Sequence, residues 1–228
     1  MKKTVILSSV FVLALIASGC GQTTKAQAEE NINHADRLSE VSKITNVPQL
    51  SKGVTYEGEF KDAIQYSDTL GEHIALISEK KASRSIEYGN ILKDAELFAY
   101  HFDIKEKDTI KQTWKVYDSA KNCIVAVAAD FVKNTFQVTD LDNNGIAETW
   151  LVYITGCKGD VSPWKMRIIM YEGKQKFTMK GEQKIIMEGE TFGGEYTFDN
   201  AFNKAPQEFR DFAIKLWNEN SVINYDKK

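Results

Sequence analysis

Apolar and polar residues alternate with a period of two through most of the chain from Val54 onward. Segment 95–104 is typical, because its alternate positions separate into two sets that face opposite ways, one with Leu97, Ala99, His101 and Asp103 and the other with Phe98, Tyr100 and Phe102. Such alternation indicates β-strands that have two distinct faces. Further runs of about five to nine residues follow, separated by Asp, Asn, Gly or Ser, as strands joined by turns would be.

The connections between these runs indicate how the strands pair. They are too short for a crossover helix, and a parallel pair needs a dozen or more connecting residues. The three prolines, at positions 48, 163 and 206, all lie outside the strand runs, as a sheet requires. We therefore expect a mainly β fold, an antiparallel meander that forms an open sheet, a sandwich or a partial barrel.

One helix is expected near the C-terminus. Pro206 suits a first helical turn, and apolar residues then recur at spacings of three and four, at Phe209, Phe212, Ala213, Leu216 and Trp217. This spacing gives one apolar stripe, which we expect to pack on the sheet.

The N-terminus has the pattern of a targeting segment. Residues 1–3 are basic at two positions, residues 5–17 are largely apolar, and small residues lead to Cys20. This order is typical of a secretory signal, and the apolar run is shorter than the roughly 20 residues of a membrane span. The alternative to lipidation at Cys20 is an ordinary signal peptide with a cysteine near its cleavage site.

The stretch LIASGC at 15–20 resembles the bacterial lipobox, in which the cysteine is lipidated and becomes the new N-terminus. The family usually has Leu where this chain has Ala17. Several acyl chains such as palmitate on Cys20 would anchor the protein stably in a membrane. The next residue, Gly21, is not the Asp that commonly retains Gram-negative lipoproteins in the inner membrane, so the resemblance implies the outer membrane.

These features divide the chain into a signal peptide at residues 1–19, a lipidated cysteine with a polar tether at 20–50, and one β-rich domain at 51–228. The segment DRLSEVSKI at 36–44 has room for a helical turn or two. Without residues 1–19 the chain carries 27 basic and 32 acidic side chains, a formal charge of about −5. With no basic stripe, nucleic acid is not an expected partner.

Two cysteines remain besides Cys20, namely Cys123 and Cys157. An exported protein with two cysteines favours a disulfide between them. Both are expected near the turns of neighbouring hairpins. Two buried free thiols are the alternative, since cysteine is among the most buried residue types.

The stretch TDLDNNGIAETW at 139–150 carries the clearest candidate site. Oxygen ligands fall at alternate positions, from Asp140, Asp142, Asn144, the Ile146 carbonyl and Glu148. Calcium takes six to eight such hard ligands. An EF-hand would need Glu where the chain has Leu151, and helices where it has strands. The pattern resembles the strand-flanked calcium loops of integrin-like and other β-repeat proteins. A hairpin turn without metal is the alternative, because Asn-Gly favours tight turns. Either way the loop is expected to be structural.

The sequence assigns no catalytic residue. No nucleophile motif, phosphate loop or zinc-type Cys/His spacing is present. His73 and His101 lie in different predicted strands, and a lone histidine in a strand is more often structural than a ligand.

About residues 136–181 resemble uncharacterised bacterial exported proteins in which a DLDxDGxxE loop precedes CxxDVSP and a MYEG segment. Some members of that family are labelled with surface polysaccharide biosynthesis. The resemblance implies export and no specified reaction. It also draws attention to the loop CKGDVSPW, where Asp160, Ser162 and Trp164 are candidates for a small binding face. The alternative is that Asp160 and Ser162 only cap the turn before Pro163.

Together these features predict a membrane-anchored envelope lipoprotein that acts as a non-enzymatic binding or structural module. Its expected partners are the membrane, through the lipid, and an envelope glycan or protein. The alternative is an enzyme or accessory factor of surface polysaccharide metabolism that uses the acids between Asp140 and Asp160. A cleft that brings Glu148, Asp160 and a histidine or second carboxylate together would favour the alternative.

Overall fold

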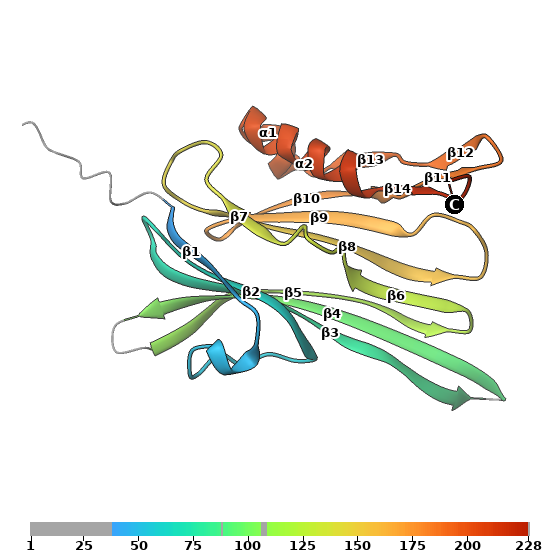
Figure 1. Ribbon diagram of the computed structural model, residues 1–228, viewed down its shortest axis with the longest axis horizontal. Coiled ribbons are helices and arrows are strands. Elements are labelled where there is room, and N and C mark those ends of the chain that lie inside the picture. The colour runs from blue at the N-terminus through green and yellow to red at the C-terminus, as the bar shows by residue number, and fades with distance from the viewer. Residues whose placement is uncertain (1–37, 88, 106–108, 228) are drawn as a thin grey trace, which may run out of the picture. The chain divides into compact units, whose positions relative to one another are not determined.

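The fold is mainly β, as the alternation predicts, with two large sheets, a small third sheet and a C-terminal helical layer (Figure 1). The computed structural model describes residues 38–87, 89–105 and 109–227. The expected signal peptide at 1–19, Cys20 and the start of the tether lie outside the described residues. In the described part of the chain, no helix is long and apolar enough to cross a membrane.

The first sheet is an antiparallel meander in chain order, β1-β2-β3-β4-β5. Its strands are β1 Ser39–Ile44, β2 Glu59–Asp68, β3 Gly71–Glu87, β4 Asn90–Lys105 and β5 Thr109–Cys123. Two-residue turns suit neighbouring antiparallel strands, and Thr69–Leu70 joins β2 to β3 in this way.

The second sheet has the order β13-β10-β9-β8-β6, and β7 also pairs with β8. Its strands are β6 Ala126–Phe131, β7 Gln137–Thr139, β8 Glu148–Lys158, β9 Lys165–Glu172, β10 Gln175–Glu182 and β13 Tyr196–Phe198. A small third sheet contains β11 Lys184–Met187, β12 Glu190–Gly193 and β14 Val222–Asn224, and its β11–β14 pair is parallel.

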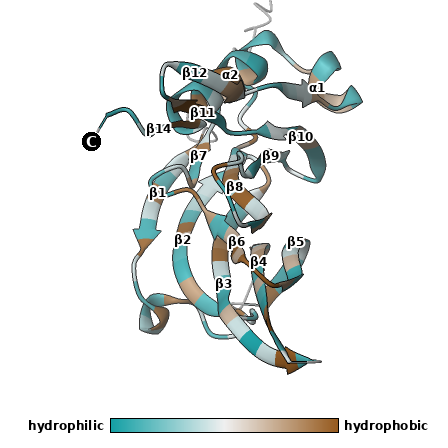
Figure 2. Cartoon of the chain, turned by 90° about the vertical axis from the view of Figure 1, so that its right-hand side faces the viewer, coloured by the Kyte–Doolittle hydropathy of each residue, from teal (hydrophilic) through white to brown (hydrophobic). Residues whose placement is uncertain are grey.

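The two large sheets pack face to face and bury a shared core. Ile77, Leu97 and Val116 of the first sheet and Leu151 and Ile169 of the second belong to one cluster of buried side chains. Figure 2 shows the apolar and polar positions that alternate along these strands. Burial of apolar side chains on both inner faces stabilises a sandwich. Of the three architectures that the sequence allows, the structure is therefore a sandwich.

The predicted C-terminal helix is confirmed as α2, Gln207–Asn220, preceded by the short helix α1, Asn200–Lys204. It packs on the outer face of the second sheet, with Phe209, Leu216 and Trp217 buried against Trp150. Pro206 precedes the first turn of α2, where its missing N–H costs no helical hydrogen bond.

The outer face of the first sheet is covered by the segment that connects β1 to β2. This segment contains the 3₁₀ helix η2, Val47–Gln49, and packs partly buried side chains such as Tyr56 against Leu76 and Phe98. The predicted boundary at residue 51 is therefore wrong, since Ser39–Ile44 forms β1 and Ile44 is buried. In place of the expected helical turn in DRLSEVSKI, Ser39–Ile44 forms a strand, and pairing with β2 gives Ile44 a core position.

The disulfide between Cys123 and Cys157 is present, with a Cα–Cα distance of 5.5 Å. Cys123 ends β5 in the first sheet and Cys157 lies in β8 of the second. The covalent bond thus joins the two layers of the sandwich.

Candidate functional site

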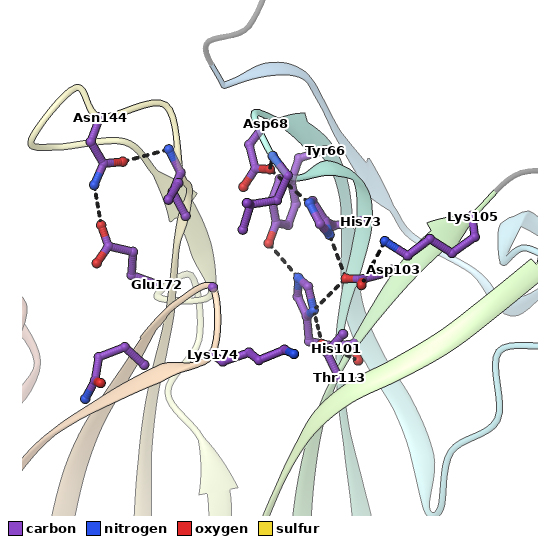
Figure 3. A pocket seen from close by; sticks show the side chains of 14 residues that line it. Tyr66, Asp68, His73, His101, Asp103, Lys105, Thr113, Asn144, Glu172 and Lys174 are labelled. Carbon is purple, nitrogen blue, oxygen red and sulfur yellow. Dashed lines mark hydrogen bonds and ion pairs between the residues drawn. The ribbon is translucent and has the colours of Figure 1, made fainter.

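A pocket of about 550 Å³ lies at one end of the sandwich. Its walls come from the inner face of β2–β5, the β2–β3 turn, the loop 140–147 between β7 and β8, and the β9–β10 turn (Figure 3). Most of the lining residues carry a polar group, although the surface that they expose to the pocket is mainly apolar; these residues are Tyr66, Asp68, His73, His101, Asp103, Lys105, Thr113, Asn144, Glu172, Lys174 and Gln175.

Strand register brings two histidines and an aspartate together in this pocket. His73 of β3 pairs directly with Asp103 of β4. His101 precedes Asp103 by two positions and therefore faces the same way. The rings of His73 and His101 lie with their centroids 5.0 Å apart. The apolar inner face of the sandwich thus continues into a polar cluster at its open end.

His73 lies between two carboxylates. Its Nε2 is 2.9 Å from Asp68 Oδ1, and its Nδ1 is 3.1 Å from Asp103 Oδ1. The imidazole is almost fully buried, at 4% exposure of the side chain. The other oxygen of Asp103 forms an ion pair with Lys105 at 3.2 Å. The pocket therefore holds alternating basic and acidic groups at contact distance.

His101 is held by two hydroxyl groups. Its Nε2 is 2.7 Å from the Tyr66 hydroxyl, and its Nδ1 is 2.5 Å from Thr113 Oγ1. Thr113 lies at a bulge in β5, where the register with β4 shifts beside His101. Bulges redirect side chains in this way. The His101 ring also stacks on Trp114, with a centroid distance of 5.2 Å, and Trp114 stacks on Tyr171 at 4.2 Å.

Burial sets the protonation of this cluster. Desolvation, reinforced by the neighbouring His73, lowers the pKa of His101 to about 3, so the ring is neutral at pH 7. Desolvation also raises the pKa of the Tyr66 hydroxyl. Burial acts to raise the pKa of Asp68, but hydrogen bonds from His73 and from two backbone N–H groups outweigh it, and this pKa is lowered.

The loop 140–147 forms a second cluster, at the position where the sequence predicts a metal. Carboxylate oxygens from Asp140, Asp142 and Glu148 lie within 4.8 Å of one another. Asp140 Oδ1 is buried and has no hydrogen-bond partner among the described residues, and a water molecule or a cation would satisfy it. The flanking elements are strands. The loop has eight residues, so the Asn-Gly pair lies within a longer loop.

Hydrogen bonds within this loop order its acidic groups. The Glu148 carboxylate is fully buried and accepts from Thr139 Oγ1 at 2.6 Å and from Leu141 N at 3.0 Å. Burial raises the pKa of Glu148 to about 7, against the hydrogen bonds, and the charges of Asp142 and Asp140 raise it further. These oxygens are the part of the predicted ligand set that the structure brings together.

Asn144 lies differently from the three acidic ligands. The Asn144 side-chain oxygen accepts from Ile146 N at 2.7 Å, and its Nδ2 donates to Asp142 Oδ2 and to Glu172 Oε1. Asn144 therefore links the loop to the wall of the pocket.

The expected binding face at Asp160, Ser162 and Trp164 is at the other end of β8. Asp160 Oδ1 accepts from Ser162 N at 2.9 Å, which is the turn-capping geometry, and hydrogen bonds from Ser162 lower the pKa of Asp160. Lys158 Nζ lies over the ring of Trp164, 4.7 Å from the ring centroid. Glu148 begins β8 and Asp160 lies just beyond its end, so about 30 Å of strand separates them. They cannot act on one substrate atom, so these acids do not support the enzyme alternative.

The histidine cluster is the part of the site that sequence reasoning missed. The alternation in segment 95–104 already places His101 and Asp103 on the face of Leu97 and Ala99. Only the β3–β4 register adds His73, and no local pattern supplies that register.

No protein-family model, curated protein or solved structure matches this chain.

Proposed function

We propose that the protein is a lipid-anchored bacterial envelope protein whose sandwich is a non-enzymatic binding module for an envelope glycan. The observation that carries the proposal is the pocket at the end of the sandwich, a concave site of about 550 Å³. Clefts of this size with convergent polar groups are the usual form of small-ligand sites. The lipobox-like stretch that ends at Cys20 supports anchoring, and Gly21 supports the outer membrane.

The chemistry of the lining supports a ligand rich in hydroxyl groups. Asp103 and Glu172 supply acceptors, while Lys105, Lys174 and Gln175 supply donors around the same cavity. A sugar hydroxyl donates and accepts at once, so it can pair with both kinds of group. The mixed charges give no strong preference for an anion or a cation, which also suits a neutral or weakly charged glycan.

Calcium in the loop 140–147 is the second part of the proposal. Asp140, Asp142 and Glu148 offer only oxygen ligands, and calcium prefers such ligands in flexible geometry. The buried, unpartnered Asp140 Oδ1 supports a cation there. Bound calcium would stiffen the loop and, through Asn144 and Glu172, the adjoining wall of the pocket. Its role is structural.

The glycan proposal is tested by retention of the purified protein on immobilised envelope polysaccharide. We expect Lys174→Ala and Gln175→Ala to weaken retention, because both side chains line the pocket and are exposed. Asp160→Ala is the matched control, since Asp160 lies at the far end of β8. Equal retention of all three variants and the wild type would refute the pocket as the binding site.

Anchoring is tested separately in cells with labelled palmitate. Incorporation into the wild type and its loss in Cys20→Ala is the expected result. A protein that stays unlabelled and is found in the soluble fraction would contradict the lipid anchor without bearing on the glycan pocket.

A further inference from the structure

The strongest additional feature is the cluster of His73, His101 and Asp103. We infer that these three side chains form a binding site for a divalent transition-metal ion of the zinc class, with open coordination positions that face the pocket. The inference goes beyond the glycan proposal and does not depend on it. It also concerns different residues from the oxygen-only loop 140–147.

The geometry of the three donors fits such an ion. One donor atom from each residue lies within 4.8 Å of the other two. Asp103 Oδ1 is 3.1 Å from His73 Nδ1 and 4.0 Å from His101 Nδ1. Ligand distances of about 2.0–2.2 Å place two ligands of a tetrahedral zinc roughly 3.3 Å apart. The separation of Asp103 Oδ1 from His73 Nδ1 is therefore close to that spacing, and its separation from His101 Nδ1 is somewhat longer.

Each histidine also has the outer partner that metal-bound imidazoles use. A ligating histidine almost always donates its other ring N–H to an oxygen, which fixes its orientation. His73 Nε2 lies 2.9 Å from Asp68 Oδ1, and His101 Nε2 lies 2.7 Å from the Tyr66 hydroxyl. The Nδ1 of His73 thereby faces Asp103 Oδ1, whereas the Nδ1 of His101 lies 4.0 Å from the same oxygen and contacts Thr113 Oγ1. Lys105 forms an ion pair with the other oxygen of Asp103.

The hydrogen-bond partners of His73 leave room for either a proton or a metal ion between its ring and Asp103. Ionised carboxylates only accept hydrogen bonds, and both ring nitrogens of His73 face carboxylate oxygens. A neutral ring can satisfy only one of them and turns a lone pair toward the other. Either a second proton or a metal ion must therefore lie between Nδ1 and Asp103.

The donor types indicate the class of metal. Imidazole nitrogen suits zinc, copper, nickel and iron, whereas calcium and magnesium prefer oxygen alone. Two histidines and one carboxylate leave at least one coordination position for water or a ligand. His101 can bind through Nδ1 once the Thr113 side chain rotates and releases the contact of its Oγ1 with Nδ1.

The test is calorimetric titration of the chelator-treated full-length protein with Zn²⁺ at pH 7.5. We expect one site per chain, and at least tenfold weaker binding in Asp103→Asn and in His73→Gln. Asp142→Asn is the matched control, because it makes the same change in the other acidic cluster, and its zinc affinity should stay within twofold of the wild type. Circular dichroism verifies that each variant is folded. Because Asp103 is partly exposed, Asp103→Asn should fold, and it keeps the test informative even if His73→Gln unfolds the protein.

Three results would overturn the inference. They are the absence of zinc binding by the wild type, binding that Asp103→Asn leaves unchanged, and binding that Asp142→Asn weakens as much as Asp103→Asn does. A Co²⁺-substituted sample gives an independent readout, since visible absorption typical of nitrogen-bound cobalt should appear in the wild type and disappear in Asp103→Asn.

Discussion

The Asp68 carboxylate accepts a hydrogen bond from Ala147 N at 2.9 Å and so connects the first sheet to the loop 140–147. Its other oxygen accepts from His73 Nε2 and, at 2.7 Å, from Leu70 N. The Asp68 side chain, which is only 3% exposed, therefore holds the β2–β3 turn, His73 and the loop 140–147 together. The two candidate metal clusters share this residue as their common support.

Replacement of Asp68 by alanine should destabilise the fold by about 3–5 kcal/mol, because three donors lose their buried acceptor. Urea denaturation measures this change in the free energy of unfolding. Asp160→Ala serves as the control, since it removes a similar turn-capping carboxylate on the exposed surface and should leave the midpoint almost unchanged. Equal effects of the two substitutions would contradict the bridging role of Asp68.

His101 should make the protein less stable in acid. Its pKa is about 3 in the fold and near 6.5 when unfolded. Between these values the unfolded chain binds more protons, so stability is present above pH 6.5 and is lost as the pH falls. From pH 6.5 to 4.5 the loss should be about 2–3 kcal/mol. This contribution is measured by comparing the denaturation midpoints of Glu148→Gln with those of the double variant Glu148→Gln, His101→Gln over this pH range.

When metal is removed by a chelator, Glu148 should make the protein more stable in acid, which is the opposite of the effect of His101. Its pKa is about 7 in the fold and near 4.5 when unfolded. The folded chain binds more protons in that window, so this contribution is present below pH 4.5 and is lost as the pH rises through 7. The expected size is about 3 kcal/mol. In His101→Gln, stability should therefore increase on acidification from pH 7 to 4.5, and a constant midpoint would count against the buried acid.

Calcium should raise the melting temperature. For a dissociation constant of about 1 mM, 10 mM calcium contributes roughly 1.4 kcal/mol, which corresponds to about 3–6 °C for a domain of this size. Thermal melts with and without calcium measure the shift. Asp142→Ala should abolish the shift and Asp160→Ala should retain it. An unchanged melting temperature of the wild type would exclude calcium from the loop at this affinity.

The disulfide should contribute about 3–4 kcal/mol, because it closes a loop with a sequence separation of 34 and restricts the unfolded chain. The double variant Cys123→Ala, Cys157→Ala should show this loss in urea denaturation. Added reductant should lower the midpoint of the wild type alone. If the variant and the wild type unfold at the same urea concentration, the disulfide does not contribute to the free energy of unfolding.

Most of the fold can be predicted from local sequence patterns. Strand alternation, short connections and the stripe at Phe209, Leu216 and Trp217 are properties of neighbouring residues, and the structure confirms them. The start of the domain was misplaced because β1 is short and mostly exposed, with Ile44 as its only buried residue. A pattern of one apolar position does not distinguish a strand from a tether.

The site was harder to predict because it is assembled across strands. Asp140, Asp142 and Glu148 are close in sequence, so their spacing already predicted that they converge. His73 and His101 are separated by a hairpin whose register shifts at a bulge between Lys80 and Ser83. Since a shift of one residue reverses every side chain, no count along the sequence could place His73 beside Asp103.

The bulge at Thr113, which directs a hydroxyl group onto His101, has a second consequence for self-association. β5 is the last strand of the first sheet, and a regular edge strand is a template onto which another chain can add. The register shift beside Thr113 interrupts that template, and the exposed Lys111 and Lys115 flank it with positive charge. Fibre-like growth from this edge is thereby opposed by the same residue that shapes the pocket.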